Sequence, residues 1–412
     1  MTSFPDTAQP SSSHLVGDVS SVIGDVSALG GDVFSVVGDL TVAERRALTN
    51  LAARSHDVIT THQHVAGAYP ASPTFSAYAG YAWLRDGAFT AEGISRYGDV
   101  ASANRFHGWA NSVLTDRRDQ VDDLVAAATR GEQPPTERML PTRFTLDGDD
   151  GSDPWWDFQT DGYGAWLWSA VTHAQRHGVD IGQWRSGINV AVDYLTAFWE
   201  RACYDWWEEH VEQRHVSTLG AIFGGLRAAL DAGVLDPARV ERATRAADDI
   251  RALVLSQGVV DGHLTKWLGS DAVDGSLPAC IVPFGLLDPT DPVALGTLGA
   301  VARDLDVEGG VHRFRADVFY GGGQWLLLSA LLGWNLAAQG NRSAALRYLR
   351  WVAAQATPDG LLPEQVPTHL LHDQSRAEWI DRWGTVATPL LWSHGMYLIL
   401  ADELGLTREA TP

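Results

Sequence analysis

From residue 41 onward, apolar residues recur every three or four positions, in stretches separated by turns and loops. This spacing is typical of helices that bury one side. Thr41 and Glu44 have the pattern of a capping box, which predicts that the first helix starts there. Further helices are expected to start near Asp86 and Asp99 and to cover 161–177, 181–202, 217–233, 237–258, 291–305, 321–340, 341–355 and 389–405. Because few stretches alternate as strands do, the sequence predicts an all-α protein of eleven or twelve helices.

The connections between the expected helices alternate between short turns and long loops. Helices of similar length joined in this way fit antiparallel pairs that pack side by side. Closing six such pairs gives a toroid of inner and outer helices whose long loops gather at one end. We expect these loops to line a pocket, because functional sites tend to lie on loops held by rigid elements.

Residues 1–40 differ from the rest of the chain. A Gly-Asp pair recurs every seven residues, at Gly17, Gly24, Gly31 and Gly38, in a tract without basic residues. A glycine in each repeat costs about 1 kcal/mol of helix propensity, which disfavours a coiled coil. We therefore expect residues 1–40 to be disordered or loosely attached, and residues 41–412 to form the helical barrel domain.

Charge and composition exclude several classes of protein. The chain has 51 acidic and 30 basic residues, a formal net charge of −21, which disfavours nucleic acid and anionic membranes as partners. Cys203 and Cys280 are too few for a disulfide framework and are expected to be ordinary reduced thiols. The N-terminus lacks the pattern of a secretory signal, which predicts a cytoplasmic protein. No metal or nucleotide motif is present, so no metal and no cofactor is expected.

Two segments carry glutamates that could perform acid and base chemistry. In YDWWEEH, Glu208 and Glu209 follow two tryptophans, and a hydrophobic wall would raise the pKa of a carboxyl as a general acid requires. A solvated helix end with two surface glutamates fits the same residues. In DGLLPEQV, Pro363 keeps Glu364 on a loop, where an ionised carboxylate could take a proton from water. Read alone, Glu364 fits an exposed loop acid better.

Three other segments carry groups that could bind hydroxyls. WLRD places Arg85 beside Asp86, which suits vicinal hydroxyls, although Asp86 also fits a helix N-cap. Asp161 in QTDG has the same two interpretations, and we favour the cap. Arg313 could bind hydroxyls or pair with one of the many acids. The 17 tryptophans suggest stacking on sugar rings, although we expect more than half to pack in the core.

These segments, in this order, resemble glycoside hydrolase family 15, the glucoamylase family, whose catalytic domain is an (α/α)6 barrel. The resemblance rests on five motifs: WLRD from Trp83, W-x-x-x-Q-x-D-G from Trp155, WEE from Trp207, R-x-x-x-D with YGGGQW from Arg313 to Trp325, and PEQ from Pro363. Each motif is weak alone, but five in register over nearly 290 residues make a strong signal.

The resemblance implies a role for each matching residue. Glu208 would be the general acid that protonates the glycosidic oxygen, and Glu364 the general base that activates water. Arg85, Asp86 and Arg313 would hold the terminal glucose, and Glu209 would bind sugar near the cleavage point. The walls of the pocket would be formed by Trp83, Trp155, Trp207 and Trp325. The family inverts, which requires the two carboxyls to stand about 6.5–9.5 Å apart.

The chain departs from the family pattern at one position. Many members hold the catalytic water with a tyrosine four residues before the WLRD tryptophan, but Ala79 stands there, between Tyr78 and Tyr81. The sequence leaves open which tyrosine substitutes. The large β-sandwich that precedes the barrel in many bacterial members is also lacking, which disfavours a long insoluble glucan as substrate.

The sequence therefore predicts an inverting, exo-acting α-glucosidase for short oligosaccharides, most of all α-1,6-linked ones of the isomaltose type. A trehalase or a maltooligosaccharide glucoamylase of the same family are the nearest alternatives. Two further alternatives are a sugar epimerase, which would need two histidines in the pocket, and a sugar-binding barrel without activity. The oligomeric state is left open.

Overall fold

The computed structural model describes residues 40–407. Apart from Leu40, the expected disordered segment 1–40 lies outside these residues. The capping box is confirmed: Thr41 and Glu44 hydrogen-bond reciprocally at the start of α2. The expected helix start near Asp99 and the expected range 161–177 are confirmed: Asp99 caps α4, and α6 ends before Gly178, which has a left-handed conformation.

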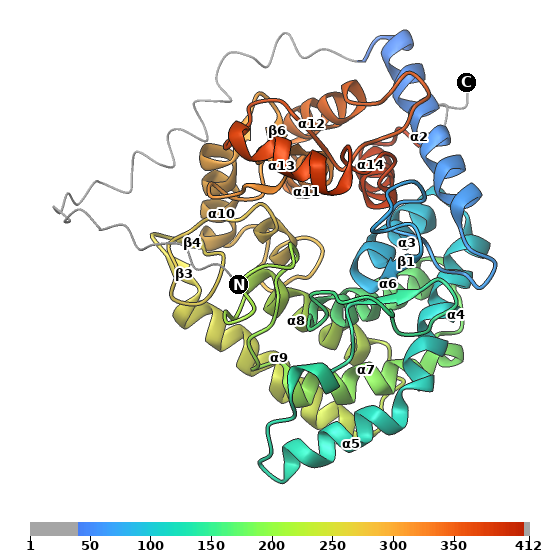
Figure 1. The fold of residues 1–412 in the computed structure, drawn as a ribbon, viewed down its shortest axis with the longest axis vertical. Coiled ribbons are helices and arrows are strands. Elements are labelled where there is room, and N and C mark those ends of the chain that lie inside the picture. Colours follow the sequence, from blue (N-terminus) through green and yellow to red (C-terminus); the bar gives the residue numbers. More distant parts are fainter. Residues whose placement is uncertain (1–39, 408–412) are drawn as a thin grey trace, which may run out of the picture. The chain divides into compact units, whose positions relative to one another are not determined.

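The helices form two concentric rings, as Figure 1 shows. Each inner helix contacts its neighbours in the ring, and the last contacts the first. The inner elements are α3 (Leu84–Tyr97), α6 (Asp161–His177), α8 (Val216–Asp231), η3 (Leu277–Cys280), α11 (Leu326–Ala338) and α14 (Leu391–Glu403). The outer helices are α2 (Val42–His62), α4 (Val100–Asp116), α7 (Arg185–Phe198), α9 (Pro237–Gln257), α10 (Pro292–Asp304) and α12 (Arg342–Ala354). Inner and outer elements alternate along the chain, so the predicted all-α (α/α)6 barrel is confirmed.

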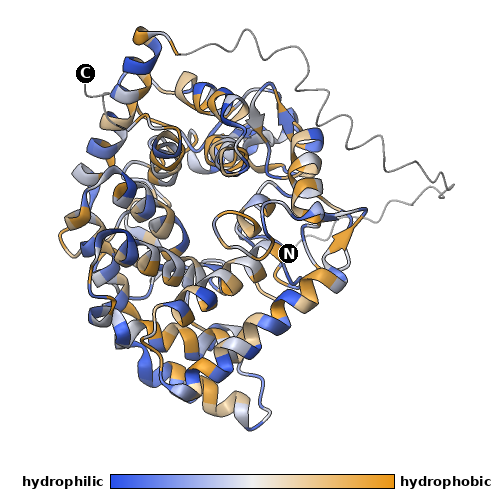
Figure 2. Cartoon of the chain, turned by 180° about the vertical axis from the view of Figure 1, so that it is seen from behind, coloured by the Kyte–Doolittle hydropathy of each residue, from blue (hydrophilic) through white to orange (hydrophobic). Residues whose placement is uncertain are grey.

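Burial separates the two rings. The inner α11 is buried along ten consecutive residues, Leu326 to Asn335, because other helices surround it. The outer α9 buries only one stripe, Ala243, Ala246, Ala247, Ile250 and Val254, at helical spacing. Figure 2 shows the hydrophilic residues of the outer helices in blue beside their apolar stripes.

Glycines let inner helices approach closely at two crossings. A Cβ on Gly164 of α6 would lie 2.3 Å from the carbonyl oxygen of Ala221 in α8. A Cβ on Gly93 of α3 would lie 2.5 Å from the carbonyl oxygen of Gly395 in α14. Both distances are impossible for a side chain, so the ring closes at these points only with glycine.

Two α-helices were not expected from the sequence: α5 (Arg118–Thr129) and α13 (Asp373–Trp383). The described residues therefore form thirteen α-helices, against the eleven or twelve expected. One inner position holds only the short 3-10 helix η3, where Pro278 and Pro283 lack the N–H groups of a longer α-helix. Other 3-10 turns are η1 (Thr136–Arg138), η2 (Ile181–Trp184) and η4 (Phe319–Gly321).

Short antiparallel strands shape the loops. The pairs are β1 (Tyr81–Trp83) with β2 (Arg143–Thr145), and β3 (Val259–Val260) with β4 (His263–Leu264). A four-stranded sheet joins β5 (Asp306–Val307), β6 (Gly310–Val311), β7 (Gln324–Trp325) and β8 (Gln365–Val366) in that order. Three of these strands position residues that the sequence assigns to the pocket. β1 contains Trp83, β7 contains Trp325, and β8 directly follows Glu364.

Three features bear on other expectations from the sequence. Cys203 and Cys280 are free and buried. No helix among residues 40–407 combines the length and the apolar character needed to cross a membrane. The same residues contain no cluster of three or more His, Cys, Asp or Glu side chains suited to a metal ion.

Candidate active site

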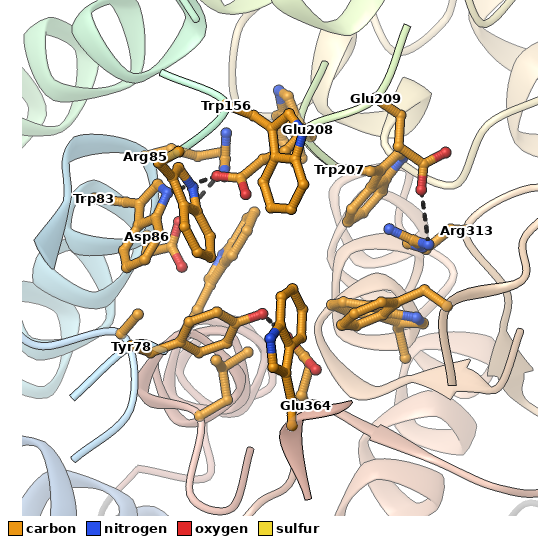
Figure 3. Close-up of a pocket in the computed structure, with 18 of the residues that line it drawn as sticks. Tyr78, Trp83, Arg85, Asp86, Trp156, Trp207, Glu208, Glu209, Arg313 and Glu364 are labelled. Atoms are coloured by element: carbon orange, nitrogen blue, oxygen red, sulfur yellow. Dashed lines mark hydrogen bonds and ion pairs between the residues drawn. The ribbon is translucent and has the colours of Figure 1, made fainter. Parts of the chain in front are cut away.

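One cavity of about 330 Å³ brings together all ten side chains that the sequence singled out. Figure 3 shows Glu208 and Glu364 extending into it from opposite sides. The ten residues are Trp83, Arg85, Asp86, Trp155, Trp207, Glu208, Glu209, Arg313, Trp325 and Glu364.

Glu208 lies on a tight turn in a left-handed conformation, with φ of 65°. This conformation costs a non-glycine residue about 1–3 kcal/mol and persists only where its surroundings impose it. The backbone N–H of Glu208 donates to the carbonyl of Asp205 at 3.0 Å. The Glu208 carboxylate accepts hydrogen bonds from Trp83 Nε1 at 2.8 Å and Gln159 Nε2 at 3.2 Å. Glu208 is therefore neither on a helix end nor free to rotate.

Hydrogen bonds to the backbone fix the position of Glu364 and of the residue before it. It lies directly before β8, and its backbone N–H donates to the carbonyl of Ala387 at 2.9 Å. The preceding Pro363 carbonyl accepts a hydrogen bond from Ser393 of α14 at 2.9 Å. Glu364 is only 3% exposed, so the interpretation as an exposed loop acid is wrong. Sheet pairing and α14 bury the loop that carries it.

Asp86 and Asp161 are not helix caps. The N-caps of α3 and α6 are Trp83 and Thr160, and the two acids lie within the first turns. Arg85 lies between them: its Nη1 donates to Asp161 at 3.0 Å, and its Nε lies 3.4 Å from Asp86 Oδ2. The expected cap at Asp161 was wrong because this buried carboxylate pairs with the guanidinium instead.

Arg313 pairs with acids and also faces the cavity. Its Nε donates to Asp317 at 2.8 Å, and its Nη2 donates to Glu209 at 3.2 Å. The Trp207 and Trp325 rings each lie 5.3 Å from the guanidinium. The pairing with acids is confirmed. The binding of hydroxyls stays a prediction for a side chain that lines the cavity.

The structure identifies Tyr78 as the tyrosine beside the carboxyl of Glu364. Its hydroxyl donates to Glu364 Oε1 at 3.3 Å, and burial raises its pKa so that it keeps this proton. Tyr81 instead bonds to Asp153, and its ring lies 3.8 Å from the guanidinium of Arg143. Tyr81 does not line the cavity.

The sequence missed several aromatic walls of the cavity. Trp379 and Trp383 come from α13 and are four residues apart, on one face of a mostly polar helix that has no buried residue. That spacing was the available signal. Tyr78, one of the two candidate tyrosines, also lines the cavity, and the other lining residues not predicted are Ala71, Trp156, Trp206, Phe319, Leu390 and Trp392.

Polar atoms without hydrogen-bond partners line this apolar cavity. Among the described side chains, Asp86 Oδ2 and Glu364 Oε2 are buried oxygens that accept no hydrogen bond, and Asp86 Oδ2 has only the ion-pair contact with Arg85. The indole N–H groups of Trp206 and Trp325 are buried donors without a partner. Leaving such groups unpaired is unfavourable, so the cavity suits a ligand that both donates and accepts many hydrogen bonds. A sugar has this chemistry.

Burial shifts the pKa values of both glutamates in the same direction. It raises the pKa of Glu208, although Arg85 and the hydrogen bonds from Trp155, Trp83 and Gln159 act against the rise. It raises the pKa of Glu364 to about 8, against the effects of Arg313 and Tyr78. Two carboxyls with raised pKa values can share one proton near neutral pH. One could then donate a proton while the other accepts one.

Known proteins are similar to this chain in sequence and in fold. The sequence profile of glycosyl hydrolases family 15 matches residues 45–339. An isomaltose glucohydrolase of Kribbella flavida is 73% identical over 368 residues, which are 89% of this chain and 96% of the relative. A trehalase of Mycobacterium tuberculosis is 28% identical over 250 residues, covering 57% of this chain and 36% of that protein.

A solved structure of a glycosidase variant in complex with glucose superimposes with a TM-score of 0.88. It is 71% identical in sequence, and the match covers 90% of this chain and all of the other. The family profile covers most of the barrel. The match to the isomaltose glucohydrolase covers 89% of this chain. The chain is therefore a glycoside hydrolase that belongs to glycosyl hydrolases family 15.

Proposed function

We propose that this enzyme hydrolyses isomaltose-type α-1,6-glucosides from the non-reducing end and releases the glucose as the β-anomer. The choice of linkage is supported by the 73% identity to the isomaltose glucohydrolase. The cavity that contains two buried carboxyls among tryptophans carries the proposal for the chemistry. Inversion needs one carboxylic acid and one carboxylate on opposite sides of the scissile bond.

Glu208 is the general acid in this proposal, and Glu364 is the base that activates water. The contacts of the two side chains in the structure favour the reverse placement of the proton: Glu208 accepts two hydrogen bonds, while Glu364 has the pKa of about 8. We expect substrate to reverse this order. A nucleophilic water that donates to Glu364 Oε2 favours the ionised form of that group, and a glycosidic oxygen next to Glu208 favours its protonated form.

The terminal glucose is held by Arg85, Asp86 and Arg313, and Glu209 binds sugar near the cleavage point. Arg85 and Arg313 have their pKa values raised, because nearby carboxylates outweigh the effect of burial, so both stay charged. The tryptophans supply flat apolar faces for the sugar rings. Tyr78, through its bond to Glu364, helps to orient the water.

Proton NMR of the first sugar released from isomaltose tests the proposal directly. β-Glucose that mutarotates only after release, and faster turnover of isomaltose than of maltose or trehalose, are the expected results. Release of α-glucose would contradict inversion. Faster turnover of trehalose or maltose would replace the proposed linkage by one of the two alternatives within the family.

The other two alternatives lack support in the cavity. An epimerase that uses paired histidines needs imidazoles near the sugar, and no histidine is among the described residues that line the cavity. A binding protein without activity would not need two buried carboxyls with raised pKa values. We retain hydrolysis as the function.

Replacing Asp86 with alanine is expected to lower kcat/KM for isomaltose roughly 10- to 100-fold, because hydrogen bonds to an ionised carboxyl are worth about 1.5–3 kcal/mol. Burial raises the pKa of Asp86 to about 7, so the effect should be largest above that pH. Asp86 is buried, and its Oδ2 has no hydrogen-bond partner among the described residues. Steady-state kinetics with isomaltose, and glucose inhibition of the variant, measure the effect.

Asp99→Ala is the matched control, because it removes an aspartate that truly caps a helix. This variant is expected to lose thermal stability but to keep its kcat/KM. If Asp86→Ala behaved in the same way, Asp86 would be a structural residue of α3 and not a ligand of sugar.

The pH dependence of kcat/KM is expected to be bell-shaped, with an alkaline limb near pH 8. Activity requires one proton on the pair of glutamates, and burial raises the pKa of Glu364 to about 8. Above that pH the pair loses its last proton and no acid remains. Below the raised pKa of Glu208 both groups are protonated, so the acid limb lies above the ordinary value of 4.5. An alkaline limb at about pH 6 or lower would contradict the electrostatic argument.

The cytoplasmic location, the lack of nucleic-acid binding and the absence of a cofactor stay predictions from the sequence. Cell fractionation tests the first. Retention on a nucleic-acid column at low salt tests the second, since net charge governs such binding. Activity after exhaustive chelation tests the third.

A further inference from the structure

A buried charge cluster lies behind the turn that carries Glu208. Lys266 Nζ donates to Asp205 Oδ2 at 2.8 Å and to Asp274 Oδ2 at 2.5 Å. These three residues, called here the Lys266 cluster, are each at most 3% exposed. None of them lines the cavity, so the cluster has no direct contact with the sugar site.

The cluster bonds to the chain on both sides of Glu208. Asp205 Oδ1 accepts the backbone N–H groups of Trp207 and Glu209, each at 2.9 Å. The Asp274 carboxylate accepts the indole N–H of Trp207 at 3.1 and 3.0 Å. The residues before and after Glu208 are therefore fixed to two carboxylates that Lys266 joins.

The cation at the centre of the cluster is a lysine in a chain that otherwise uses arginine. Lys266 is the single lysine among 30 lysines and arginines in the chain, so arginine is used at every other basic position. The ammonium lies 3.9 Å from the centre of the Phe314 ring, next to Arg313. A compact point charge can contact two carboxylates and a ring face in this space, whereas the planar fork of arginine has a different shape.

The charges in the cluster are maintained by its own members. Burial alone would lower the pKa of Lys266, but Asp274 and Asp205 more than offset it and raise the pKa. Burial alone would raise the pKa of Asp205, but Lys266 and His215 hold it below its ordinary value. The His215 Nδ1 lies 4.0 Å from Asp205 Oδ2, and burial lowers the pKa of this imidazole.

We propose that Lys266 is a positioning residue for the general acid: through Asp205 and Asp274 it holds the strained turn that aims Glu208 at the glycosidic oxygen. The left-handed conformation of Glu208 needs such support, because it is unfavourable for glutamate. This inference rests on the proposed role of Glu208. It concerns the placement of the proton donor and not Arg85, Asp86 and Arg313, which are proposed to hold the terminal glucose.

Substrates with different leaving groups separate this role from a merely structural one. Sugar leaving from isomaltose needs a proton from the acid, whereas fluoride leaving from α-glucosyl fluoride needs far less protonation. Lys266→Met is expected to lower kcat for isomaltose roughly 10- to 100-fold, because small misplacements of catalytic groups have effects of this size. The KM for isomaltose and the kcat for α-glucosyl fluoride are expected to stay within about threefold of the parent values.

Asp274→Ala is the second variant, since it leaves Lys266 and Asp205 as a balanced pair and is expected to fold even if Lys266→Met does not. It should show the same selective loss on isomaltose. Glu92→Gln is the matched control: Glu92 is fully buried in α3, pairs with Arg96 and Arg176, and is not part of the site. Its two activities should fall equally or not at all.

Circular dichroism and thermal unfolding establish which variants are folded. Folded Lys266→Met or Asp274→Ala that lost both activities equally, or lost neither, would overturn the inference. Glu208→Gln is measured in parallel. If Glu208→Gln lost as much activity on α-glucosyl fluoride as on isomaltose, the proposed role of Glu208 would fail. If Glu208→Gln lost activity selectively on isomaltose but the Lys266 and Asp274 variants did not, only this inference would fail.

Discussion

Glu208→Gln is expected to lower kcat for isomaltose by about 100-fold or more, the usual scale for loss of a general acid. Glutamine has nearly the shape of glutamate and can still accept the hydrogen bonds from Trp83 and Gln159. It has no proton to give to the departing sugar oxygen. KM should change little, because the groups proposed to hold the terminal glucose are untouched.

The leaving group again provides the sharpest control. Glu208→Gln is expected to retain far more activity on α-glucosyl fluoride than on isomaltose, and its pH profile should lose the alkaline limb. Activity on isomaltose close to that of the parent would remove Glu208 from the mechanism. If Glu364→Gln were the variant whose loss depended on the leaving group, the two glutamates would exchange roles.

Glu364→Gln is expected to lower kcat by about 100-fold or more on isomaltose and on α-glucosyl fluoride alike. Both substrates need an activated water, so a better leaving group does not restore the kcat of this variant. The variant should fold normally, because the backbone bonds to Ala387 and Ser393 that fix this loop do not involve the side chain. Loss of the acid limb of the pH profile is expected as well.

Chemical rescue tests the role of Glu364 independently. Glu364→Ala leaves space next to Tyr78 where a small anion fits, and azide needs no base to attack the anomeric carbon. Added azide should restore activity and give β-glucosyl azide, with the leaving sugar protonated by Glu208. Rescue that gave the α-azide, or no rescue with a folded variant, would contradict the assignment of the base.

Local signals in the sequence placed most of the helices. The capping box at Thr41, the cap at Asp99 and the glycine stop at Gly178 act within one turn of the chain, so short sequence patterns reveal them. The helix α13 was not predicted, because none of its residues is buried and its apolar stripe is short. Its tryptophans face the cavity, which a search for core-facing stripes does not detect.

Other errors arose where long-range contacts override local preference. An aspartate before a helical run usually caps the helix, but Asp86 and Asp161 lie inside their helices beside the buried guanidinium of Arg85. Tyr78 and Tyr81 are three residues apart and look equivalent in sequence. Pairing of β1 with β2 directs Tyr81 to Arg143, and the loop before it leaves Tyr78 next to Glu364.

By itself, the sequence determined the order of most helices and ten of the residues that line the pocket. Periodicity and capping act over a few residues, and the family motifs are contiguous, so both can be read along the chain. The tertiary structure alone decided how these residues meet: Tyr78 contacts Glu364 across 286 positions, and Trp83 contacts Glu208 across 125. Burial in the closed ring also raised the pKa values of both glutamates, because desolvation depends on everything packed around a group and not on its neighbours in sequence.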